Sequence, residues 1–166
     1  MHPAARPARA LALAGAPDQA LREAQAAWDL SPGNEMTELY LTAFRAFLQP
    51  QAELVDTAWK LVLSPSALSL APSILSYALA RNGQRDEAMQ IVETCTTCSS
   101  DNACTNAMHV ATLLALNQDD QAMQLAQRAC EAHCGLLPVL PHDPANAALQ
   151  RHPGYAVLQQ QVFGDM

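Results

Sequence analysis

The five cysteines are the residues of this chain with the most distinctive chemistry, and all of them lie between positions 95 and 134. Thiols that meet can form a disulfide, bind a metal ion as thiolates, or pack as small apolar groups. The positions are Cys95, Cys98, Cys104, Cys130 and Cys134. Because five is an odd number, at least one thiol stays outside any pairing within the chain.

The spacing of these cysteines leaves three kinds of site open. A disulfide requires Cα atoms within about 7 Å, and the candidate pairs are Cys98–Cys104 and Cys104–Cys134. A zinc site would use Cys98, Cys104 and Cys134 with His133, or with His109 in its place. No compact pair of Cys-x2-Cys motifs supports zinc, and buried thiols that only pack are the third interpretation. The pattern favours one or two disulfides.

Catalytic chemistry is not indicated by the remaining motifs. A redox role for Cys95-Thr-Thr-Cys98 would need a strand before it, and none is predicted there. His109, His142 and His152 lack a partner pattern for catalysis. The sequence contains neither a glycine-rich phosphate loop nor a nucleophile elbow. We therefore expect a protein that is not an enzyme and needs no cofactor.

The composition indicates an all-α protein. Half of the 166 residues are hydrophobic but only 5% are aromatic, so the core must be built mainly from Ala, Leu and Val. Apolar residues recur at helical spacing, and no stretch alternates as a strand would. A formal charge of −7 argues against a nucleic-acid partner. No run approaches the roughly 18 apolar residues of a membrane span.

A triplet of an acid, a polar residue and alanine recurs along the chain and sets its organisation. It stands at Asp18–Ala20, Asp86–Ala88 and Asp120–Ala122, so the copies are 68 and 34 residues apart. A period of 34 is typical of helical repeats. It predicts units at 1–34, 35–68, 69–102 and 103–136, followed by a connector and capping helix at 137–166.

Each unit is expected to contain two helices. Proline favours the first turn of a helix, and glycine favours the position after its end. These signals predict four pairs of helices. The first pair is 7–14 and a helix that starts at Pro17, and the second is 35–48 and 52–63. The third is a helix from about 72 and one at 85–96, and the fourth is 102–116 and a helix that ends at Gly135. One or two closing helices then end near Phe163.

The repeated positions resemble those of tetratricopeptide repeats. The matching residues are the turn glycines Gly15 and Gly83, the helix alanines Ala20, Ala27, Ala88, Ala122 and Ala129, and the closing Pro32. The second unit departs from the pattern, with Gln49 in the turn and Leu54 in place of the alanine. The resemblance covers about residues 5 to 135. It implies a right-handed superhelix of about four antiparallel helix pairs.

The resemblance also implies a function for the concave surface, which the first helix of each unit lines. Such surfaces bind an extended peptide or a partner helix, so we expect a non-enzymatic protein- or peptide-binding scaffold. The expected groove residues are Leu39, Ala43, Phe47, Ser73, Tyr77, Arg81, Ala111 and Leu114, with Ala46, Ala80 and Ala107 beside them. With a single lysine, Lys60, the chain offers no clamp for a terminal carboxylate. The apolar first unit could also pair with another copy, giving a homo-oligomer.

The repeat arrangement gathers the five cysteines on one edge, opposite the turn at Asn82–Ala88. This suggests an alternative function as a sensory or regulatory module of a larger bacterial signalling protein. In that case the cysteine edge would be linked by disulfides or by a metal. The sequence as it stands predicts a cytoplasmic protein, whereas disulfide bonding would predict an extracytoplasmic domain of a longer protein.

Overall fold

The protein is all-α. The computed structural model describes residues 6–64, 70–98, 103–138 and 140–164, and none of these residues lies in a β-strand. The first half contains α1 (Arg6–Leu13), α2 (Pro17–Leu30), α3 (Glu35–Leu48), α4 (Glu53–Leu63) and α5 (Ala71–Arg81). The second half contains α6 (Arg85–Cys98), α7 (Ala103–Ala107), α8 (Val110–Ala115), α9 (Asp119–Glu131), the 3-10 helices η2 (Leu140–His142) and η3 (Pro144–Arg151), and α10 (Tyr155–Phe163).

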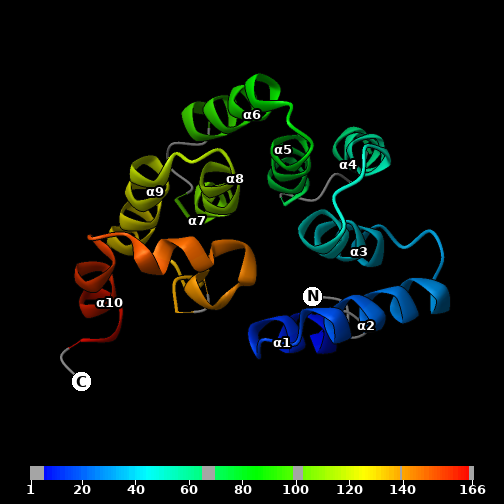
Figure 1. The fold of residues 1–166 in the computed structure, drawn as a ribbon, viewed down its shortest axis with the longest axis horizontal. Coiled ribbons are helices and arrows are strands. Elements are labelled where there is room, and N and C mark those ends of the chain that lie inside the picture. Colours follow the sequence, from blue (N-terminus) through cyan, green and yellow to red (C-terminus); the bar gives the residue numbers. More distant parts are fainter. Residues whose placement is uncertain (1–5, 65–69, 99–102, 139, 165–166) are drawn as a thin grey trace.

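The helices follow an arc, with α3, α5 and α8 on its inner side and α4, α6 and α9 on its outer side (Figure 1). Helices that follow each other in sequence pack together as pairs, and α5 packs against both α3 and α8. The segment that contains η3, orange in Figure 1, returns to the inside of the arc and contacts α8 and α9. No helix in the described part of the chain is both long and apolar enough to cross a bilayer.

The second helices of successive pairs bury equivalent positions at intervals of 34 residues. The first set is Ala20, Leu54, Ala88 and Ala122, and the second is Ala24, Ala58, Val92 and Ala126. Most of these side chains are alanine, which lets the backbones of neighbouring helices approach closely in a tightly packed interior. A larger residue is accommodated at Leu54, the position where the second unit departs from the others.

Three turns that join paired helices share one backbone geometry. Gly15, Gly83 and Asn117 have φ values of 78°, 81° and 58°, so all three are left-handed. Asparagine adopts this conformation more readily than most side chains do, which explains its use at the third site. The residue after each donates its backbone N–H to the carbonyl five residues earlier: Ala16 to Leu11 (2.9 Å), Gln84 to Leu79 (3.0 Å) and Gln118 to Leu113 (2.8 Å).

The helix expected at 102–116 is interrupted in the structure. It is divided into α7 and α8 by Met108 and His109. The backbone N–H of His109 bonds to the carbonyl of Asn106 at 3.0 Å, three residues back, which tightens the turn locally. This turn carries the buried His109 ring against α5, where its Nδ1 lies 3.1 Å from Ser76 Oγ. Neither proline nor glycine marks the interruption in the sequence.

The end of α9 also differs from the expectation, which placed a terminating glycine at Gly135. The helix ends at Glu131, and the left-handed residue after it is His133, with φ 53°. The next residue, Cys134, donates its N–H to the carbonyl of Ala129 at 2.9 Å, which completes the same kind of helix end as at the repeat turns.

The buried apolar side chains form several clusters of unequal size. The largest combines α8 and α9 with the segment after α9, including Leu113, Leu140 and Leu149. A second cluster joins α3, α4, α5 and α6. The cluster around α1 and α2 is small, with Ala8, Ala24 and Leu41 as its buried members. The C-terminal half therefore has the more extensive core.

Candidate functional site

A cavity of about 160 Å³ lies on the inner side of the arc. Its walls come from α3, from α5, and from the junction between α7 and α8. The first two helices and the segment at the start of η3 contribute further walls. The lining residues are Leu39, Tyr40, Ala43, Phe44 and Phe47; Leu70, Ser73, Ile74 and Tyr77; Met108 and Ala111; and Ala12, Pro17, Asp143, Pro144 and Ala145.

The lining repeats with the same interval as the helices. Two sets of lining residues are each spaced by 34: Tyr40, Ile74 and Met108, and Ala43, Tyr77 and Ala111. Three successive inner helices thus present equivalent positions to one cavity. The cavity is therefore built by the regular spacing of the array.

Six of the eight groove residues expected from the sequence line this cavity: Leu39, Ala43, Phe47, Ser73, Tyr77 and Ala111. The other two, Arg81 and Leu114, lie outside its lining. Leu114 is buried in the C-terminal cluster together with Leu140 and Leu149, so the chain itself covers that part of the inner face. The neighbouring Ala107 is fully buried in the same cluster.

Arg81 stabilises one wall of the cavity through two lining residues, although it does not itself line the cavity. Its Nη1 donates hydrogen bonds to Tyr77 Oη at 3.0 Å and to the backbone carbonyl of Phe47 at 3.1 Å. Its guanidinium carbon lies 5.8 Å from the centre of the Tyr77 ring, a distance typical of cation–π contacts. These contacts tie α5 to the end of α3, so Arg81 holds the Tyr77 side chain and the backbone at Phe47 in place, and both residues line the cavity.

The Tyr77 hydroxyl is held in its protonated form. Burial raises the pKa of Tyr77, and the negative charge of Asp143 raises it further. The hydrogen bond and charge of Arg81 act in the opposite direction. Because the hydroxyl accepts a hydrogen bond from Arg81, its own proton can be donated elsewhere.

Asp143 brings a carboxylate to the rim of the cavity. Its side chain is exposed, and its Oδ1 accepts the backbone N–H of Ala145 at 3.0 Å, which caps the start of η3. Among the described residues that line the cavity, Asp143 is the one with a formally charged side chain. The sequence predicts a connector and capping helix at 137–166, but it does not predict that this segment returns to the inner face.

A buried polar cluster lies between α5 and α8, beneath the cavity. Ser76 Oγ is 3.1 Å from His109 Nδ1 and 2.9 Å from Thr112 Oγ1, and it donates to the carbonyl of Ser73 at 3.0 Å. Burial lowers the pKa of His109 to about 4, so the ring is neutral near pH 7. Ser76 is 0% exposed and His109 1% exposed. This Ser–His contact is therefore closed to substrates and holds two helices together.

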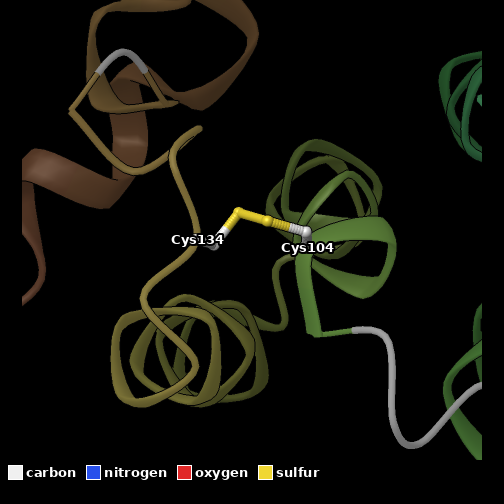
Figure 2. The surroundings of a disulfide bond; sticks show 2 residues. All are labelled: Cys104 and Cys134. Carbon is white, nitrogen blue, oxygen red and sulfur yellow. A yellow bond between two sulfur atoms is a disulfide. The ribbon is translucent and has the colours of Figure 1, made fainter.

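A disulfide joins Cys104 in the first turn of α7 to Cys134 just after α9 (Figure 2). The two Cα atoms are 5.3 Å apart, within the usual range for a disulfide. Cys134 is buried, and its backbone is fixed by the bond to Ala129 described above. The bridge thus fastens the beginning of the α7–α8–α9 segment to its end.

This disulfide decides between several of the alternatives for the cysteines. Because Cys104 is bonded to Cys134, the pairing Cys98–Cys104 is excluded in this structure. The same bond removes two of the thiolates that the zinc alternative required, and His133, its proposed fourth ligand, is exposed on the surface. Cys130 is a half-buried free thiol. The side chain of Cys98 lies outside the described residues.

The cysteines and the repeat turns lie at opposite ends of the outer helices. α6 starts just after the Gly83 turn and carries Cys95 near its end, and α9 starts just after Asn117 and leads to Cys134. A 14-residue helix such as α6 is about 21 Å long. The disulfide is therefore separated from the Asn117 turn by the length of α9.

Two features of the described chain are candidates for function, namely the apolar cavity on the inner side of the arc and the disulfide at the end of α9. Both depend on residues that are far apart in the sequence. Comparisons of the chain with protein-family models, with curated proteins and with solved structures each found no match.

Proposed function

We propose that this chain is a non-enzymatic scaffold of the tetratricopeptide-repeat type that binds a segment of a partner protein on its concave face. The observation that carries the proposal is the apolar cavity to which α3, α5 and the α7–α8 junction contribute equivalent positions. A repeat array presents such positions in register because each unit packs on the next in the same way.

Local geometry supports the repeat type. The left-handed turns at Gly15, Gly83 and Asn117 are separated by 68 and 34 residues and share one hydrogen-bond pattern. The buried small residues of the second helices follow the same interval. In this proposal the four units form a superhelix, and η3 with α10 closes its C-terminal end.

The size and lining of the cavity suit a single side chain of the partner. An engineered apolar cavity of about 150 Å³ holds one benzene molecule, so about 160 Å³ accommodates one aromatic or leucine-sized group. Pockets for drug-sized ligands are larger, at about 300 to 1,000 Å³. Buried anchors of this kind contribute much of the affinity at protein interfaces. We propose that one apolar anchor enters between Phe47, Tyr77 and Ala111.

Filling the cavity tests the proposal. Ala111→Leu adds apolar volume at a half-buried lining position, whereas Ala156→Leu makes the same change on the exposed surface of α10. Peptides selected from a random library by the wild-type chain should bind the Ala111→Leu variant at least about tenfold more weakly, because their anchor is displaced. Affinities can be measured by fluorescence anisotropy, with helicity checked by circular dichroism.

The control variant Ala156→Leu should retain the wild-type affinity. Selected peptides that bind a correctly folded Ala111→Leu variant as tightly as the wild type would contradict the assignment of the cavity as the binding site. A library that yields no binder above background would contradict the scaffold function itself.

The disulfide favours a second candidate function, that of a redox-responsive regulatory module in an oxidising compartment. Titration of the denatured chain with a thiol reagent should find at least two more thiols after reduction than before it, because reduction releases Cys104 and Cys134. The same number of thiols in both samples would remove this alternative.

A further inference from the structure

We propose that Asn82 is a site of spontaneous deamidation, that the folded turn between α5 and α6 suppresses the reaction, and that its products weaken this turn. Asn82 is followed by Gly83, and it is the one asparagine among the six in the sequence with glycine after it. Glycine has no Cβ, so its backbone nitrogen can approach the asparagine side chain closely. This modification is independent of what the cavity binds.

Deamidation needs only water as a second reactant. The Gly83 backbone nitrogen attacks Cγ of Asn82, so an N–Cγ bond forms, the Cγ–Nδ2 bond breaks, and ammonia leaves with the proton of the Gly83 N–H. Water then opens the resulting succinimide ring at either of its carbonyls. The products are aspartate and isoaspartate, in which the main chain runs through the side-chain carbon. Both products carry an additional negative charge.

The folded turn opposes the first step of this reaction. Asn82 has ψ 10°, which places the Gly83 nitrogen beside the backbone nitrogen of Asn82 and away from its Cβ. The Gly83 N–H donates to the carbonyl of Ala80 at 3.2 Å. Asn82 Nδ2, the atom that must leave, donates to the carbonyl of Ala78 at 2.9 Å. Ring closure therefore requires the turn to open first.

The position of Asn82 makes its products unfavourable in the folded chain. A carboxylate has no N–H, so it cannot replace the hydrogen bond to the carbonyl of Ala78. It also brings negative charge to the C-terminal end of α5, where the helix dipole is already negative. The folded turn is therefore more stable before deamidation than after it.

Two arginines that flank the turn tie it to neighbouring helices. Arg81 Nη1 donates to the carbonyl of Phe47 at the end of α3. Arg85 Nη2 donates at 2.6 Å to the carbonyl of Leu116, just after α8. Isoaspartate at position 82 adds an atom to the main chain between these arginines. Both ties should loosen, because the backbone positions that hold the two side chains then change their spacing.

The test follows the wild-type chain at pH 8, both folded in buffer and unfolded in guanidinium chloride. The products at each asparagine are measured by mass spectrometry of proteolytic peptides. In the unfolded chain, Asn82 should deamidate at least about tenfold faster than Asn34, which precedes glutamate rather than glycine. In the folded chain, Asn82 should react at least about tenfold more slowly than in the unfolded chain, because only the opened turn reacts.

Two variants with the same change from amide to carboxylate test the effect on the turn. Asn82→Asp reproduces the aspartate product and should unfold at lower urea concentration than the wild type. Asn34→Asp makes the change at the N-cap of α3, where the side-chain oxygen accepts the N–H groups of Met36 and Thr37 at 3.0 and 3.3 Å. Aspartate caps a helix as well as asparagine does, so this variant should keep the wild-type stability.

Each comparison has a result that would overturn the proposal. Equal rates at Asn82 and Asn34 in the unfolded chain would remove Asn82 as the modification site. Equal rates at Asn82 in the folded and unfolded chains would show that the turn gives no protection. Equal urea midpoints for Asn82→Asp and Asn34→Asp would show that the product does not weaken the turn. None of these measurements involves a binding partner, so each result leaves the proposed scaffold function standing.

Discussion

The C-terminal half of the molecule, from α6 to α10, and the N-terminal half, from α1 to α5, share one helical spacing but differ in what holds them together. In the C-terminal half a large apolar cluster is fastened by the Cys104–Cys134 disulfide. In the N-terminal half, α1 and α2 pack on α3 through a small cluster, and Leu30 at the end of α2 is 82% exposed.

This difference bears directly on the candidate site. The cavity is bounded on one side by Ala12 and Pro17 from the N-terminal half and on the other by Asp143 to Ala145 from the closing segment. Regions with few buried contacts open more often than well-packed ones. The wall of the cavity formed by α1 and α2 should therefore open more often than the wall formed by the closing segment. We expect a partner to enter from the side of α1 and α2.

Removing the disulfide should cause the largest loss of stability, and it should reduce the difference in stability between the two halves. For a bridge that spans 30 residues, loss of the constraint on the unfolded chain corresponds to about 4 kcal/mol. The double variant Cys104→Ser/Cys134→Ser should unfold at lower urea concentration, with the amides of α8 and α9 losing most protection from hydrogen exchange. Cys130→Ser, which leaves the bridge intact, serves as the control. Equal stability of the double variant and the control would contradict a stabilising role for the bridge.

Acid should weaken the junction between the halves, because His109 lies between α5 and α8. Below its ordinary pKa of 6.5 the unfolded chain binds a proton at this residue, whereas the folded chain does so only near pH 4. Stability is therefore retained above about pH 6.5 and lost as the pH falls towards 4. The difference in pKa corresponds to about 3 kcal/mol.

Urea unfolding between pH 7.5 and pH 4 measures this loss. A His109→Gln variant, which has no ionisable group at this site, should show a smaller decrease over the same range. Parallel pH profiles for the variant and the wild type would contradict the assignment to His109.

Substitutions at the turn glycines should give the smallest of these effects, and they show whether the two halves unfold together. Gly15→Ala and Gly83→Ala each force alanine into a left-handed conformation, at a cost of about 1 to 2 kcal/mol. At Gly83 the whole cost should appear in global unfolding. At Gly15 it should appear mainly as faster hydrogen exchange in α1 and α2, because this end can open alone. Gly135→Ala, at a glycine without a left-handed backbone, should change stability by less than about 1 kcal/mol. Equal global effects at Gly15 and Gly83 would show that the halves unfold together.

Local signals in the sequence predicted much of this fold. α3 occupies the range 35–48 expected from its apolar spacing, and α4 begins within one residue of the prediction. Six of the residues that the repeat resemblance placed in a concave groove also line the cavity. Such features are readable because helix periodicity and turn glycines depend on neighbouring residues.

The features that sequence reasoning missed depend on contacts between distant segments. The break at His109 accompanies a hydrogen bond to Ser76, 33 residues away. The return of the closing segment depends on burial of Leu140 and Leu149 against helices that precede them. The choice of Cys134 over Cys98 as the partner of Cys104 depends on how α9 ends. No local pattern encodes these long-range choices.

The closing segment has a consequence for the order in which the walls of the cavity form during synthesis of the chain. Protein synthesis runs from the N-terminus, and helical elements with local contacts can form as they emerge from the ribosome. The rim at Asp143 to Ala145 is added only after α3, α5 and α8, which form the rest of the cavity. In a nascent chain the rim of the cavity would therefore be added only after the helices that form its other walls have had time to fold.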